Sequence, residues 1–71
     1  MEDFQIRVID ERDQLSEKLD KLDSFIESDR FQDLHWRDRH LLTRQAVCMQ
    51  SYKEILDERI NRFKTEEEKA A

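Results

Sequence analysis

FQIRVIDERDQLSEKLDKLDSF, residues 4–25, is the stretch that decides the fold of this chain. Seven of its side chains follow one another in alternating steps of four and three: Phe4, Val8, Glu11, Leu15, Lys18, Leu22 and Phe25. Because an α-helix has about 3.6 residues per turn, this spacing places all seven on one face. The same steps recur within residues 42–63, at Leu42, Gln45, Met49, Tyr52, Leu56, Arg59 and Phe63. The two stretches predict two amphipathic helices.

The composition supports an all-α fold. Glycine and proline are both absent from the 71 residues, so tight turns and phosphate-binding glycine loops lack their usual residues. Charged residues make up 44% of the chain, which is typical of long helices and coiled coils. We expect an antiparallel, coiled-coil-like hairpin with helices at about 2–28 and 36–64, a loop at about 29–35 and a frayed tail at 65–71.

The two predicted stripes can be paired along their whole length. If facing residues have numbers that sum to 67, each stripe member meets a member of the other stripe, for example Phe4 with Phe63, Leu15 with Tyr52, Leu22 with Gln45 and Phe25 with Leu42. In this register Glu11 lies against Leu56, with Tyr52 and Arg59 one turn to either side. Residues 1–28 carry a net charge of −5 and residues 36–64 a net charge of +3, which favours antiparallel pairing of the two halves.

Several apolar residues lie outside these stripes. Leu19, Ile26, Ala46 and Ile60 form one flank, and Leu41, Cys48 and Ile55 form the other. Two helices cannot cover so wide an apolar arc, and a chain of this length often needs oligomerisation for stability. We therefore expect a homo-oligomeric helical bundle.

The sequence argues against several kinds of chemistry. Cys48 is the single cysteine, so no disulfide forms within the chain, and a nucleophilic role would need a base that His35 and His40, about two turns away, do not supply. The two histidines lie in no metal-ligand pattern, and we expect no metal, no cofactor and no enzymatic activity. No stretch resembles a membrane span or signal peptide, which predicts a cytoplasmic protein. The net charge of −5 argues against duplex nucleic acid as the partner.

The polar members of the stripes are the strongest candidates for function. Glu11, Lys18, Gln45, Tyr52 and Arg59 either form a polar network that fixes register, or line a ligand pocket in which cations hold phosphates and the tyrosine stacks on a base. A second cluster contains Arg37, Arg39, His40 and Arg44 beside Trp36. It is either a solvated face that balances the acidic first helix, or an anion-binding surface with Trp36 as a stacking plane.

These residues also carry a resemblance. Phe4-Gln5-x-Arg7-Val8-x-x-Glu11, Leu15-x-x-Lys18-Leu19-x-x-Leu22-x-x-Phe25-Ile26 and Gln45-x-x-x-Met49-x-x-Tyr52-x-x-Ile55-Leu56-x-x-Arg59-Ile60 resemble a family of very short phage and prophage proteins related to a crAss-like phage protein. The resemblance covers about residues 1–63. In architecture, the chain is more loosely similar to phage helical-hairpin sponges, which oligomerise and sequester the nucleotide signals of bacterial immunity.

Two functions follow as expectations. In the first, a non-enzymatic phage anti-defence protein oligomerises and holds a cyclic or ADP-ribose-type signalling nucleotide through Arg7, Glu11, Lys18, Trp36, Arg44, Gln45, Tyr52 and Arg59. In the second, the chain is a protein–protein interaction module whose apolar flanks dock onto a host defence protein and inhibit it. Under the second expectation the polar residues of the stripes are purely structural.

Overall fold

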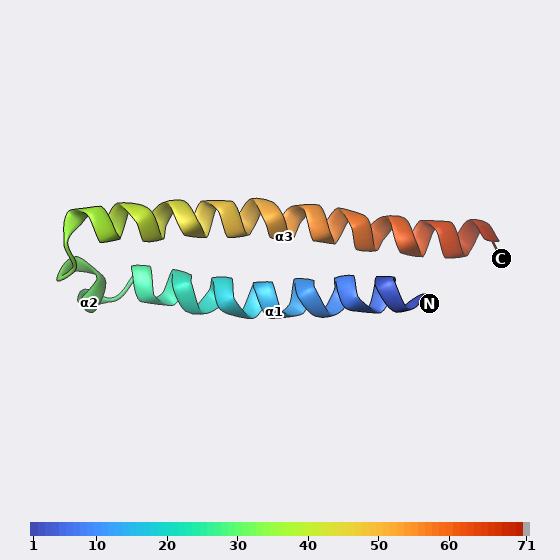
Figure 1. Ribbon diagram of the computed structural model, residues 1–71, viewed down its shortest axis with the longest axis horizontal. Coiled ribbons are helices and arrows are strands. Elements are labelled where there is room, and N and C mark those ends of the chain that lie inside the picture. Colours follow the sequence, from blue (N-terminus) through green and yellow to red (C-terminus); the bar gives the residue numbers. More distant parts are fainter. Residues whose placement is uncertain (71) are drawn as a thin grey trace.

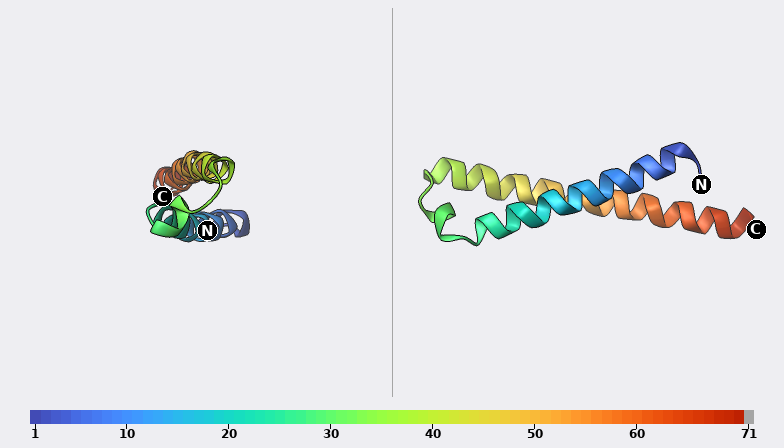
Figure 2. Two further views of the ribbon diagram at one scale, coloured as in Figure 1. Left: turned by 90° about the vertical axis from the view of Figure 1, so that its left-hand side faces the viewer. Right: turned by 90° about the horizontal axis from the view of Figure 1, so that it is seen from below.

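The computed structural model describes the backbone of residues 1–70 and the side chains of residues 1–65. Three helices follow one another: α1 (Asp3–Ile26), α2 (Asp29–Gln32) and α3 (Trp36–Ala70). Helices α1 and α3 lie side by side and antiparallel, with α2 at the closed end of the hairpin (Figure 1). The chain is a rod of 55 × 16 × 14 Å, along which the two long helices cross one another (Figure 2). The all-α expectation is confirmed, with one long helix packed on another.

Local hydrogen bonds define where the helices begin and end. The backbone N–H of Glu2 donates to Oε1 of Gln5 at 2.9 Å, which closes the first turn of α1 and explains why Gln5 is buried. At the other end, the Ser28 hydroxyl donates to the carbonyl of Phe25 at 2.6 Å, an interaction that competes with further helix. The N–H of Arg37 donates to Nδ1 of His35 at 3.1 Å, so His35 caps the start of α3.

The connection and the tail differ from a simple loop and a frayed end. The connection contains the single turn α2, whose Phe31 is buried and packs edge-on against Phe25 with ring centroids 6.2 Å apart. Helix α3 continues to Ala70, beyond the expected end at Lys64, because the glutamate, lysine and alanine residues that follow are good helix formers. The expected frayed tail lies partly outside the described residues, since Ala71 is not described.

The pairing of α1 with α3 agrees with the register read from the sequence. Phe4 and Phe63 meet edge to face, with ring centroids 5.7 Å apart. Next to them, Val8 packs in a buried cluster with Leu56, Ile60 and Phe63, and Leu56 has no exposed surface.

The face by which the helices meet is rotated from the predicted one. Arg12 and Leu19 alternate with Val8 and Leu15 in the contact, and all four are buried or half-buried. The predicted polar members of the seam are instead all exposed: Glu11, Lys18, Gln45, Tyr52 and Arg59. Two stripes share the same apolar residues, and the helices bury the stripe whose alternate members are more apolar, because burying Lys18 or Arg59 without a partner is costly.

The flank that contains Leu19 and Ile60 is therefore the true seam. Leu19 is 4% exposed and Ile60 is 5% exposed, although we expected both to lie outside the contact between the helices. The other expected flank does lie outside it: Leu41 and Ile55 are more than half exposed, and Cys48 is exposed.

Candidate nucleotide-binding flank

Six of the eight predicted site residues lie on one side of the hairpin, and Arg44 lies at the edge of that side. We call this surface the cationic flank, and it comprises Arg7, Glu11 and Lys18 on α1 and Arg44, Gln45, Tyr52 and Arg59 on α3. Steps of four and seven residues keep the α1 set on one helix face, and steps of seven do the same for Gln45, Tyr52 and Arg59. Arg44 precedes Gln45 by one residue and lies about 100° further round α3, and all seven residues are exposed. The rotation of the seam has moved these side chains from the inside of the hairpin to its surface, where a ligand can reach them.

A hydrogen bond between the two helices lies at the centre of this flank. The Tyr52 hydroxyl donates to Oε1 of Glu11 at 2.5 Å. This bond, desolvation and the negative charge of Glu11 raise the pKa of Tyr52 above its ordinary 10.0, and the positive charge of Arg59 opposes that rise. Tyr52 remains 43% exposed, so its ring is fixed in place and still available for stacking.

The flank is locally positive although the chain is acidic. It carries four cationic side chains, Arg7, Lys18, Arg44 and Arg59, against two carboxylates: Glu11, which already accepts a hydrogen bond, and Asp38, seven residues before Gln45 on the same face of α3. Asp13 follows Glu11 by two residues and therefore projects about 200° away around α1. The net charge of −5 thus does not describe this surface.

Gln45 and Trp36 lie at different distances from the centre. The side-chain amide of Gln45 donates to the sulfur of Met49 at 3.8 Å, about two turns before Tyr52 along α3. Trp36 is at the start of α3, roughly 24 Å from Tyr52 at the helical rise per residue. It stacks on His35 with centroids 5.6 Å apart, and the Arg37 guanidinium lies 5.3 Å from its ring. A single copy of the chain does not bring Trp36 and Tyr52 to one small ligand.

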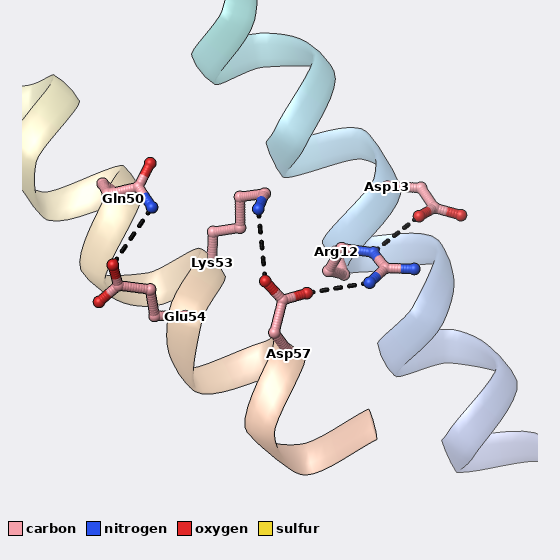
Figure 3. A network of polar contacts seen from close by, with 6 residues as sticks. All are labelled: Arg12, Asp13, Gln50, Lys53, Glu54 and Asp57. Atoms are coloured by element: carbon pink, nitrogen blue, oxygen red, sulfur yellow. Dashed lines mark hydrogen bonds and ion pairs between the residues drawn. The ribbon is translucent and has the colours of Figure 1, made fainter. Parts of the chain in front are cut away.

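The contact between the helices contains a charged network that the sequence analysis missed. Arg12 bridges Asp57 at 2.9 Å and Asp13 at 2.8 Å, and Lys53 approaches Asp57 at 3.3 Å (Figure 3). The hydrogen bond from Arg12 lowers the pKa of Asp57 below its ordinary 3.8, desolvation opposes this, and Lys53 adds to the lowering. The sequence could have predicted this network, because Arg12 and Lys53 occupy the polar positions of the stripe that contains Leu19. This network joins the two helices in addition to the Tyr52–Glu11 hydrogen bond of the predicted set.

Two features of the structure bear on other classes of protein. Among the described residues, no group of three or more His, Cys, Asp or Glu side chains is placed to hold a metal ion. In the part of the chain covered by the structure, no helix combines the length and apolarity needed to cross a bilayer.

The chain is similar to a protein of known origin but undescribed role. The uncharacterized 7.5 kDa protein in the denB-rIIB intergenic region of Enterobacteria phage T4 is 41% identical over 61 residues, covering 86% of this chain and 95% of the phage protein. No solved structure matches the chain. The expectation of a small phage protein is supported by this relative. A family model described as Sequestin matches residues 2–62, and the chain belongs to the Sequestin family.

Proposed function

We propose that the chain is a non-enzymatic phage anti-defence protein that oligomerises and sequesters a phosphate-bearing nucleotide signal of host immunity. The observation that carries this proposal is the cationic flank with the Tyr52–Glu11 hydrogen bond at its centre. A flat ring held beside a carboxylate and a guanidinium offers a stacking plane, a hydrogen-bond acceptor and a phosphate donor within one surface.

Each residue of the flank has a role in this proposal. Four cations contact phosphate groups: Arg7, Lys18, Arg44 and Arg59. Tyr52 stacks on a base, while Glu11 and Gln45 hydrogen-bond to base or ribose. Trp36 contributes a second stacking plane only if it comes from another copy of the chain, because it lies too far from Tyr52 within one copy.

The comparisons support the same direction. The family name Sequestin points to sequestration, and the relative in phage T4 places a similar chain in a phage genome. Sequestration requires binding without turnover, which suits a short rod with an exposed polar surface. Relationship to the crAss-like phage protein and to hairpin sponges stays a prediction from sequence resemblance.

Isothermal titration with cyclic dinucleotides and with ADP-ribose tests the proposal. Arg59→Ala should weaken binding of whichever probe binds by at least tenfold, because it removes a charge-assisted contact to phosphate. Arg30→Ala is the matched control, since Arg30 is an exposed arginine on α2, away from the flank. Equal affinity of both variants for the probe would contradict the assignment of Arg59.

A second function is favoured by the exposed apolar residues of α3. Leu41, Val47 and Ile55 are each more than half exposed, and such side chains can dock onto a host protein and block it. Under this alternative Arg59→Ala leaves partner binding intact, whereas substitutions at Leu41 or Ile55 abolish it. Retention of a host protein by the Arg59→Ala variant, together with no nucleotide binding by the unmodified chain, would favour this second function.

A further inference from the structure

The rod exposes more surface than a compact chain of its size. Its accessible surface is 5789 Å², whereas a compact monomer of 8.8 kDa exposes about 4,800 Å². The radius of gyration of 16.2 Å likewise exceeds the roughly 11 Å expected for a compact domain of this length. The excess of roughly 1,000 Å² is close to the about 800 Å² that each partner contributes to a standard protein interface. One further chain of similar size is enough to cover it.

Part of the uncovered apolar surface forms a stripe along α3. Leu41, Cys48 and Ile55 follow one another at intervals of seven, on the side of α3 that does not contact α1. Leu41 is 56% exposed, Ile55 is 57% exposed and Cys48 is a free, exposed thiol. A seven-residue apolar repeat is the pattern by which one helix packs along another. We propose that this stripe binds a second copy of the chain, α3 against α3, antiparallel, with Cys48 on the two-fold axis.

The stripe is complementary to itself in that arrangement. Facing residues then have numbers that sum to 96, so Leu41 meets the partner's Ile55, and Cys48 meets the partner's Cys48. The Leu41–Ile55 contact occurs twice and the Cys48–Cys48 contact occurs once, on the axis, as a two-fold interface requires.

Arg37 lies four residues before Leu41 and Arg59 four residues after Ile55, so the two arginines flank the stripe on opposite sides. A two-fold axis brings each flank against the same flank of the partner, and Arg37 therefore does not face the partner's Arg59. The interface does not rest on the proposed function.

The single native cysteine allows a direct test without nucleotide. In copper–phenanthroline oxidation, the unmodified chain should form a Cys48–Cys48 disulfide dimer, because the two thiols face one another within disulfide reach. The Cys48→Ser, Val47→Cys double variant moves the thiol one residue, to the side of α3 away from the stripe, and should stay uncrosslinked. Equal crosslinking of the two chains, or none in either, would overturn the interface.

Sedimentation equilibrium of charge variants tests the direction of the pairing. Leu41→Glu alone and Ile55→Lys alone should weaken the dimer at least tenfold, while Val47→Glu, at a residue 62% exposed on another side of α3, should not. The Leu41→Glu, Ile55→Lys double variant should regain the dimer, because antiparallel pairing brings each glutamate to a lysine. Parallel pairing would oppose like charges, so failure of this rescue contradicts the antiparallel arrangement. All three substituted residues are exposed, and helix content by circular dichroism confirms that the variants fold.

The interface and nucleotide binding have separate readouts. A monomeric chain that still binds nucleotide would overturn the interface and leave the nucleotide-binding part of the proposed function standing. A Cys48-linked dimer that binds no nucleotide would support the interface and contradict the proposed nucleotide binding.

Discussion

The role assigned to Tyr52 depends on which helix face packs in the hairpin. On the sequence Tyr52 belongs to a buried stripe, whereas in the structure it is 43% exposed and hydrogen-bonded to Glu11 across the helix pair. In the proposed nucleotide binding, the ring of Tyr52 should matter more than its hydroxyl. We predict that Tyr52→Phe keeps most of the affinity and that Tyr52→Ala loses roughly tenfold or more, as measured by isothermal titration. Equal loss in both variants would mean that the ring does not stack on a base.

Asp57 gives a second prediction at this scale, in the pH dependence of stability. Its pKa is lowered in the folded state, chiefly by the hydrogen bond from Arg12. Its contribution to the free energy of unfolding is therefore full above its unfolded pKa near 3.8 and is lost as the pH falls through its lower folded pKa. The urea midpoint of Asp57→Asn should fall less steeply below about pH 4 than that of the unmodified chain. Asp20→Asn, at an exposed residue, is the control and should keep the original steepness.

At the scale of the helices, the observed seam can be distinguished from the predicted one by adjacent substitutions. Leu19 is 4% exposed, so Leu19→Ala should destabilise the fold by about 2–4 kcal/mol. Lys18 is exposed, and Lys18→Ala should leave the free energy of unfolding nearly unchanged. Urea denaturation followed by circular dichroism measures both. A larger loss of unfolding free energy in Lys18→Ala than in Leu19→Ala would mean that the helices meet by the predicted face.

The same pair of residues shows how far the sequence could take the fold. Helix periodicity and the absence of glycine and proline predicted two long antiparallel helices, and the Phe4–Phe63 contact has the predicted register. The choice of face was not determined, because Val8 and Leu15 belong to two overlapping stripes that differ by one residue. That choice depends on Arg12 finding Asp57 on the other helix, a contact between residues far apart in the chain. Glu11, Lys18, Gln45, Tyr52 and Arg59 were predicted as one polar set inside the hairpin, and their position on its exposed surface could be seen only once the seam was known.

At the scale of the whole molecule, the charge distribution and the rod shape both agree with the proposed binding of nucleotide by an assembled chain. The rod places four of its 13 basic residues on one flank and exposes an apolar stripe beside them, so that the proposed assembly and ligand binding would use neighbouring surfaces. An electrostatic flank of this kind should bind nucleotide more weakly as salt increases, because exposed charges are screened over about 10 Å at 0.1 M ionic strength. Titration of the bound probe at increasing sodium chloride measures this, and an affinity independent of salt would contradict a role for Arg7, Lys18, Arg44 and Arg59.

The most direct test of the central claim is native mass spectrometry of the chain purified from bacteria, with and without a panel of cyclic dinucleotides and ADP-ribose derivatives. The account predicts a discrete oligomer whose mass increases by that of a bound nucleotide, and an Arg59→Ala oligomer whose mass does not. An oligomer that gains no mass from any member of the panel would contradict nucleotide sequestration and leave the cationic flank without a ligand.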